Sequence, residues 1–323
     1  MTPPLKLTRK DFMSPDEVRW CPGCADYSVL AQVQKVLPTL GIPREQFVFV
    51  GGIGCSSRFP YYMATYGIHG IHGRAPAIAT GVKLAHPQLS VWVVTGDGDA
   101  LAIGTSHTVH ALRRNVDLKI LLFNNRIYGL TKGQLSPTSE LGKRTKSTPL
   151  GSVETPLDPM TIALGAGATF VARAIATDAA QVQGLIERAA RHRGAAFIEL
   201  MQNCVIFNDG AFDEIAAGPR LVAEHGKPLI FGEQAVALDG LTPIAVAKDD
   251  PRALIHDETS DLMGLLLARL PRTTFPPVLG VLRAVSRPTY DSLFGEQVAA
   301  ARRTTLQTVL ESGDTWVVPE RRA

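Results

Sequence analysis

The sequence predicts an α/β fold with a mostly parallel sheet, helices on both faces and a C-terminal extension. Up to about residue 210, short and continuously apolar segments alternate with helical segments, which is typical of strands buried on both faces. Beyond residue 210 the alternation weakens and prolines become frequent. We therefore expect a first domain over residues 1–210 and a wrapping extension over residues 211–323.

The expected elements alternate along the first domain. Strands are predicted at residues 46–51, 90–95, 118–123 and 196–201. Helices are predicted at residues 26–37, 76–85, 100–114 and 178–191, and in the extension at residues 259–270 and 289–309. Pro38 should end the first helix, and Asp178 suits the N-terminus of the fourth.

Composition excludes several classes of protein. Of 323 residues, 20% are charged and 45% hydrophobic, which is ordinary for a globular protein, and the net charge of +3 is too small to suggest nucleic-acid binding. No apolar run reaches the roughly 20 residues of a membrane helix. The N-terminus lacks the apolar segment of an export signal, so we expect a cytoplasmic protein with reduced thiols.

Residues that could bind a ligand or a metal follow four predicted strands. Cys55, Asp97, Asn125 and Cys204 each come shortly after a strand. Ligand sites of parallel sheets lie at the carboxyl ends of the strands, so we expect one shared site there.

The four cysteines suggest a metal centre. Cys21 and Cys24 have C-x-x-C spacing, whereas Cys55 and Cys204 stand alone. Four thiolates suit one 4Fe–4S cluster or one tetrahedral zinc ion. Zinc ribbons pair two C-x-x-C knuckles and this chain has one, which favours the cluster and leaves zinc as the alternative.

The segment Gly96-Asp97-Gly98 predicts a diphosphate site. A dinucleotide loop would need a third glycine where Leu101 stands, and no Walker A motif occurs. Glycines at a strand end allow the backbone to approach a diphosphate, and magnesium prefers oxygen ligands. We expect these ligands to be the side chains of Asp97 and Asn125 and the carbonyl of Ile127.

Together these motifs resemble the β subunit of 2-oxoacid:ferredoxin oxidoreductases. The similarity covers residues 15–210 and is strongest at residues 20–24 (WCPGC), 52–56 (GIGCS), 69–74 (HGIHGR), 96–99 (GDGD) and 124–134 (NNRIYGLTKGQ). It implies a thiamine diphosphate-binding fold with thiamine diphosphate, magnesium and one 4Fe–4S cluster on the four cysteines. The cofactor-binding residues it implies are Gly54, Cys55, Ser56, His72, Gly73, Arg74, Gly96, Asp97, Gly98, Asp99, Asn125, Ile127, Gly129, Leu130 and Thr131.

The resemblance also implies the reaction, which is oxidative decarboxylation of a 2-oxoacid with coenzyme A and reduction of ferredoxin. Arg58 could bind the distal carboxylate of a substrate. In the family, a basic residue at this place with Lys132 nearby is associated with 2-oxoglutarate, so the resemblance favours a 2-oxoglutarate synthase. The alternatives are an enzyme for pyruvate or many 2-oxoacids, a non-redox thiamine-dependent decarboxylase subunit, and a zinc-bearing structural subunit.

One catalytic group is missing. Thiamine activation uses a carboxylate beside the aminopyrimidine, and the region before Gly96 is too short to hold a second domain that carries it. We therefore expect an α subunit to supply this carboxylate and the coenzyme A site, and the chain to be inactive alone.

Overall fold

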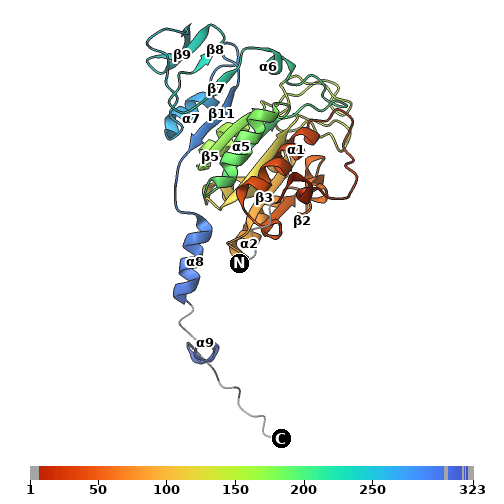
Figure 1. Cartoon of the computed structure of the whole chain (residues 1–323), viewed down its shortest axis with the longest axis vertical. Coiled ribbons are helices and arrows are strands. Elements are labelled where there is room, and N and C mark those ends of the chain that lie inside the picture. The colour runs from red at the N-terminus through yellow and green to blue at the C-terminus, as the bar shows by residue number, and fades with distance from the viewer. Residues whose placement is uncertain (1–6, 302–304, 315, 317, 319–323) are drawn as a thin grey trace.

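An eight-stranded sheet forms the centre of the protein (Figure 1). The computed structural model describes residues 7–301, 305–314, 316 and 318. The strand order is β2-β1-β3-β4-β6-β5-β11-β7. Every neighbouring pair is parallel except β5 and β11, so β11 and β7 run opposite to the other strands. Their bounds are β1 Phe47–Gly51, β2 Tyr66–His69, β3 Ser90–Gly96, β4 Leu118–Asn124, β5 Phe170–Ile175, β6 Ala196–Met201, β7 Leu221–Ala223 and β11 Val278–Ala284.

Helices cover both faces of the sheet, which confirms the predicted fold class. One face carries α1 (Asp26–Val36) and α5 (Ala179–Arg191). The opposite face carries α2 (Ala75–Ala85), α3 (Thr105–Arg113), α4 (Pro159–Gly165) and α7 (Asp261–Ala268).

The strands read as unbroken apolar runs because both of their faces are buried. In β3, Val91 and Val93 join the core beneath α2 and α3, whereas Trp92 and Val94 join the core beneath α1 and α5. Burying such side chains contributes about 1.5–3 kcal/mol each.

Most of the predicted elements are confirmed, and one helix differs. The segment predicted as a helix over residues 100–114 is a π-helical turn at Asp99–Ile103, followed by α3. The break falls at Gly104, where a Cβ atom would lie 2.4 Å from the carbonyl oxygen of Asp99 and 3.0 Å from the Cα of Gly73. The backbones of Gly73 and Gly104 thus pack closer than side chains allow, and the helix is interrupted there.

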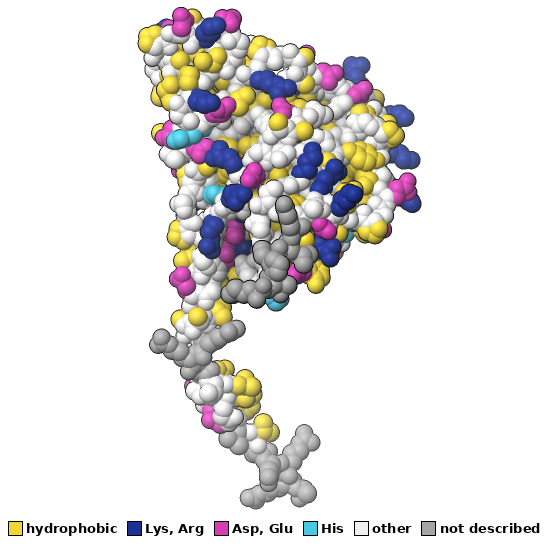
Figure 2. Space-filling view, viewed as in Figure 1, with side chains coloured by type: hydrophobic (Ala, Val, Ile, Leu, Met, Phe, Trp, Pro, Cys, Tyr) yellow, Lys and Arg dark blue, Asp and Glu magenta, His cyan; other side chains and the backbone are white. Residues whose placement is uncertain are grey.

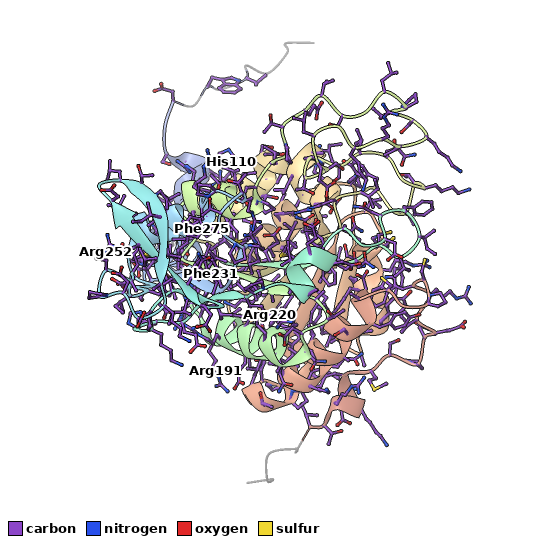
Figure 3. All side chains as sticks on the ribbon, turned by 90° about the horizontal axis from the view of Figure 1, so that it is seen from above. His110, Arg191, Arg220, Phe231, Arg252 and Phe275 are labelled. Atoms are coloured by element: carbon purple, nitrogen blue, oxygen red, sulfur yellow. The ribbon has the colours of Figure 1, made fainter. Side chains whose placement is uncertain are left out.

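The C-terminal half adds elements that the sequence pattern did not reveal. A three-stranded antiparallel sheet contains β8 (Ile230–Phe231), β9 (Gln234–Asp239) and β10 (Thr242–Ala247). It is attached through the ring of Phe231, whose centroid lies 5.6 Å from that of Phe275 (Figure 3). The strands β7 and β11 lie beyond residue 210 yet belong to the main sheet, and the division of the chain at that residue stays a prediction.

The remaining helices are short or peripheral. The helix predicted at residues 289–309 corresponds to α8 (Tyr290–Ala301) and α9 (Leu306–Glu311), and residues 302–304 between them lie outside the described residues. The helix α8 extends away from the body of the protein (Figure 1). Also present are α6 (Asp213–Ala217) and 3-10 helices at Arg9–Phe12, Leu37–Leu40, Arg44–Gln46 and Ser56–Tyr62.

The surface is of mixed charge. Lysine and arginine side chains are interspersed with acidic and apolar ones over the visible face of the body (Figure 2). Within the described residues, no helix is both long enough and apolar enough to cross a membrane.

Candidate active site

Four neighbouring strands bring the predicted site residues together at one edge of the sheet. The strands β1, β3, β4 and β6 are consecutive in the sheet and parallel. Their carboxyl ends lead into the segments that carry Cys55, Asp97, Asn125 and Cys204, respectively. The expected convergence of these four residues is therefore present in the structure.

A first cavity contains most of the residues expected to bind the cofactor, and we call it the diphosphate cavity. Of those fifteen residues, all except Gly73 and Arg74 line it. Gly98 must be a glycine, because a Cβ atom there would lie 2.2 Å from the ring of Tyr128. The hydroxyl of Tyr128 in turn donates to the carbonyl of Gly98 at 3.0 Å.

Asp97 is buried in this cavity and firmly oriented. Its Oδ2 accepts hydrogen bonds from Ser136 Oγ at 2.5 Å and from Thr138 Oγ1 at 2.6 Å. Burial raises the pKa of Asp97, although the two hydroxyl groups oppose this effect. Asp97, Asn125 and Ile127 line the same cavity, and carboxylate, amide and carbonyl oxygens are the donor types that a hard metal ion takes.

A second cavity, the thiol cavity, is lined by all four cysteines and has a volume of about 450 Å³. The sulfur atoms of Cys204 and Cys55 lie 3.5 and 3.7 Å from the position of a Cβ atom on Gly129. Burial, followed by the charges of Asp26, Cys204 and Cys21, raises the pKa of the Cys55 thiol to about 11.

The four thiols line one cavity. Among the residues described, no group of three or more His, Cys, Asp or Glu side chains has the arrangement of a metal-ion site. A single zinc ion would require four sulfur atoms about 2.3 Å from one centre. Four sulfur donors on one cavity suit either a 4Fe–4S cluster or a zinc ion.

The two cavities share a wall. Cys55, Asn125, Gly129, Leu130 and Gln202 line both of them. A group held by the cysteines would thus lie next to a cofactor held in the diphosphate cavity.

Arg58 and Lys132 both line the thiol cavity. Arg58 also lines a third cavity of about 500 Å³, which includes Tyr61 and His69. This third cavity meets the diphosphate cavity at Ile53, Gly54 and Leu130. Arg58 therefore lies between the thiol cavity and a cavity that adjoins the diphosphate cavity.

Similarity to known proteins decides the family. The chain is 53% identical to the 2-oxoglutarate oxidoreductase subunit KorB of Mycobacterium tuberculosis over 329 aligned residues, which cover 96% of this chain and 88% of that protein. The chain belongs to the family of 2-oxoacid:ferredoxin oxidoreductase β subunits. A β subunit of 2-oxoacid:ferredoxin oxidoreductase 1 from Aeropyrum pernix is 46% identical over 59% of the chain and 60% of its own length.

Two further comparisons agree with this family. Residues 52–200 match the thiamine pyrophosphate enzyme C-terminal TPP-binding domain. A solved structure of 2-oxoglutarate:ferredoxin oxidoreductase from Magnetococcus marinus, with 2-oxoglutarate, coenzyme A and succinyl-CoA bound, aligns with a TM-score of 0.80 at 33% identity. That alignment covers 95% of this β subunit and 96% of the matched chain.

The structure gives Asp99 a role that sequence reasoning missed. Its carboxylate accepts hydrogen bonds from Thr95 Oγ1 at 2.6 Å, the backbone N–H of Gly73 at 2.6 Å and that of Ile53 at 3.1 Å, and contacts His72 Nδ1 at 2.5 Å. Asp99 thus joins the loops after β1 and β2 to the start of the π-helical turn.

Asp26 is a site residue that sequence reasoning missed. It is 1% exposed and lines the diphosphate cavity, and burial raises its pKa to about 7. Among the described residues, none donates a hydrogen bond to its Oδ1. Its place in the sequence, two residues after Cys24 and at the start of a helix, could have marked it only as an N-terminal helix residue.

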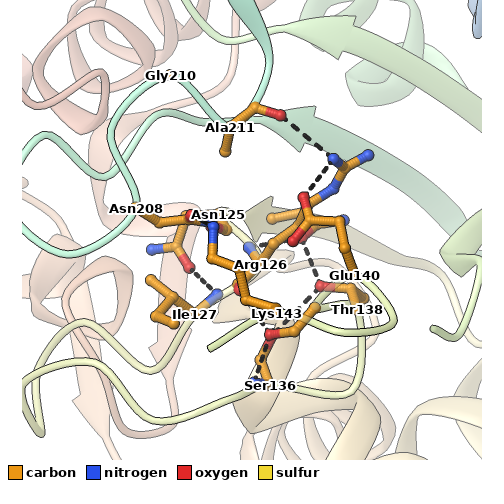
Figure 4. Close-up of polar contacts among 12 residues, drawn as sticks. Asn125, Arg126, Ile127, Ser136, Thr138, Glu140, Lys143, Asn208, Gly210 and Ala211 are labelled. Carbon is orange, nitrogen blue, oxygen red and sulfur yellow. Dashed lines mark hydrogen bonds and ion pairs between the residues drawn. The ribbon is translucent and has the colours of Figure 1, made fainter. Parts of the chain in front are cut away.

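Arg126 holds three segments together beside Asn125 (Figure 4). Its Nη1 donates to Glu140 Oε1 at 2.8 Å and to the carbonyl of Ala211 at 3.2 Å, and its guanidinium lies 4.2 Å above the ring of Phe212. The backbone φ of Arg126 is +57°, which is uncommon for a residue other than glycine.

Asn208 also links separate segments beside Asn125. Its Nδ2 donates to the carbonyl of Asn125 at 2.9 Å, and its Oδ1 accepts from Lys143 (Figure 4). Asn208 and Arg126 together fix the segments after β4 and β6 around Asn125. The contacts of these two side chains have no sequence signature, because they join residues far apart in the chain.

Proposed function

We propose that this β subunit serves an enzyme that converts 2-oxoglutarate and coenzyme A to succinyl-CoA and carbon dioxide. Two oxidised ferredoxins each accept one electron, and one proton is released. The observation that carries this proposal is the shared wall between the diphosphate cavity and the thiol cavity. A non-redox thiamine enzyme has no use for four thiols next to its cofactor.

In this proposal Cys21, Cys24, Cys55 and Cys204 hold one 4Fe–4S cluster. All four are free thiols that line one cavity, and the raised pKa of the Cys55 thiol disfavours a bare thiolate there. A bound cluster would supply the positive charge that favours deprotonation. Free thiols also agree with a reducing compartment such as the cytoplasm.

We further propose that Asp97, Asn125 and the carbonyl of Ile127 bind magnesium and the diphosphate. When bound, thiamine diphosphate supplies a nucleophilic carbon and an electron sink. The contribution of this chain is to orient Asp97 through Ser136 and Thr138 and to enclose the site.

Arg58 and Lys132 are proposed to select the substrate. A guanidinium suits two-point binding of a carboxylate. Arg58 lies where the third cavity and the thiol cavity meet, within reach of both. Pyruvate has no distal carboxylate and would not use this contact.

The remaining parts of the proposal concern the assembly. An α subunit supplies the activating carboxylate and the coenzyme A site, and ferredoxin accepts the electrons. Every residue assigned here to a cofactor, the cluster or the substrate lies within residues 1–210. Residues 211–323 are proposed as a wrapping extension.

Two substitutions test the assignment in the αβ complex purified without oxygen. Cys55→Ala should lose iron and acid-labile sulfide, whereas Asp97→Ala should lose thiamine diphosphate and magnesium but keep the iron. Near-native circular dichroism serves as the folding control for both variants. Zinc in place of iron in the unaltered complex, or full iron in the Cys55 variant, would refute the cluster.

A further inference from the structure

Gln202 connects the thiol cavity with the diphosphate cavity. It is the first residue after β6, and its backbone N–H donates to the carbonyl of Asn124 at 2.9 Å. Gln202 is 3% exposed, and it is the one glutamine that lines either cavity. The sheet therefore places a buried side-chain amide on the wall that the two cavities share.

The amide of Gln202 does not serve to hold the backbone together. Its Nε2 donates to the sulfur of Cys24 at 3.1 Å, and among the residues that the structure describes none donates to its Oε1. Gln34 is equally buried, but its Nε2 donates to the carbonyl of Tyr62 at 3.2 Å and so joins two segments of the chain. Burying an amide with one atom unpartnered costs free energy. The place of Gln202 on the cavity wall suggests that this cost is tolerated for a role toward a bound group.

The direction of the bond to Cys24 follows from its chemistry. A cysteine that holds a metal centre has lost its proton, so its sulfur can only accept a hydrogen bond. The Nε2 group is the donor of a glutamine side chain, whereas its Oε1 only accepts. In the described part of the chain, no other side-chain N–H donates to a cysteine sulfur. Gln202 therefore acts on Cys24 and on no other of the four cysteines.

We infer that Gln202 raises the reduction potential of the proposed 4Fe–4S cluster by donating its Nε2–H to the sulfur of Cys24. Reduction by one electron adds negative charge to the iron and to its sulfur ligands, and an N–H donor stabilises that charge. The reduced form gains more from this hydrogen bond than the oxidised form does. Gln202 acts through Cys24 and is a positioning residue.

This inference rests on the proposed function, because it requires a cluster on the four cysteines. A higher potential makes the cluster a better acceptor for an electron that crosses the shared wall from the diphosphate cavity. The substrate that is oxidised in the proposed reaction supplies this electron, and ferredoxin receives it afterwards. Gln202 thus favours the first of these two transfers.

The test is a redox titration of the cluster in the αβ complex, followed by its visible absorption without oxygen. Gln202→Met keeps the length of the side chain and removes its N–H donor. This variant should keep its iron and acid-labile sulfide, and its cluster should be harder to reduce. We expect the equilibrium constant for one-electron reduction to fall about three- to tenfold, which corresponds to a potential about 30–60 mV more negative.

Gln181→Met is the matched control. Gln181 lies in the first turn of α5, lines neither cavity, and among the described residues none donates to its Oε1 either. This variant should have the potential of the unaltered complex. An iron-loaded Gln202→Met complex with an unchanged potential would overturn the inference.

A second measurement uses the unaltered complex, so it does not depend on the folding of a variant. Glutamine that carries a heavy nitrogen isotope in its side-chain amide is incorporated, and pulsed electron paramagnetic resonance is recorded on the reduced cluster. We expect a coupling between the cluster and the labelled nitrogen, which Gln202→Met removes. A reduced cluster without this coupling overturns the inference and leaves the proposed function standing. An unaltered complex without iron and sulfide overturns both.

Discussion

At the scale of single residues, the site depends on hydrogen bonds that orient the carboxylates of Asp97 and Asp99. Asp97 could be predicted from its place between two glycines at a strand end. Ser136 and Thr138, which orient it, could not be predicted, because they lie on a loop about forty residues away without periodic pattern. Asp99 was expected to bind the cofactor, but its four contacts could be found only in the fold.

Arg58 carries the prediction on substrate choice. Removing one partner of a desolvated charged hydrogen bond costs about 2–5 kcal/mol. Arg58→Ala should therefore lower kcat/KM for 2-oxoglutarate at least about tenfold, with a much smaller effect on pyruvate. Steady-state assays of the αβ complex with both substrates measure this, and Arg191→Ala, on the exposed end of α5, is the control. An equal loss on both substrates would contradict the role in selecting 2-oxoglutarate.

At the scale of elements, the apolar strands were predictable and the exceptions have physical causes. The edge strand β2 is largely exposed and therefore lacks an apolar run, and β5 contains Arg173 at a buried position. The π-helical turn after Gly98 depends on the contact between Gly73 and Gly104, which residues distant in sequence create.

Gly104 and Gly184 give a matched pair of substitutions. A methyl group at Gly104 would lie 2.4 Å from a carbonyl oxygen, so Gly104→Ala should destabilise the protein by about 1–3 kcal/mol. Gly184 is exposed within α5 and has open space around it, so Gly184→Ala should stabilise by about 0.5–1 kcal/mol. Chemical denaturation measures both effects. Equal effects of the two variants would argue against the close contact.

His192, at the end of α5, predicts a dependence of stability on pH. Burial and the charge of Lys119 lower the pKa of His192 to about 4 from 6.5. The unfolded chain therefore binds this proton more readily, and the contribution to stability is complete above pH 6.5 and is lost as the pH falls toward 4. Denaturation of His192→Gln across this range should show a flatter profile, whereas His86→Gln, an exposed histidine, should keep the original slope.

At the scale of the whole molecule, one edge of the main sheet gathers the residues of the proposed site. The sheet brings the diphosphate cavity, the thiol cavity and Arg58 together, and it was predictable because parallel strands end at one edge. The β7 and β11 strands and the three-stranded sheet were not predictable, since their pairing joins distant segments.

The most direct test of the account is whether substrate electrons reach a cluster held by the cysteines. We would add 2-oxoglutarate and coenzyme A, without ferredoxin or oxygen, to the αβ complex and record the visible absorption of the cluster. The account predicts rapid bleaching in the complex, and none in the Cys55→Ala complex or in the β subunit alone. The account would be contradicted if an αβ complex that carries all its cofactors and turns over substrate showed no change in cluster absorption. It would also be contradicted if the absorption of the β subunit alone bleached.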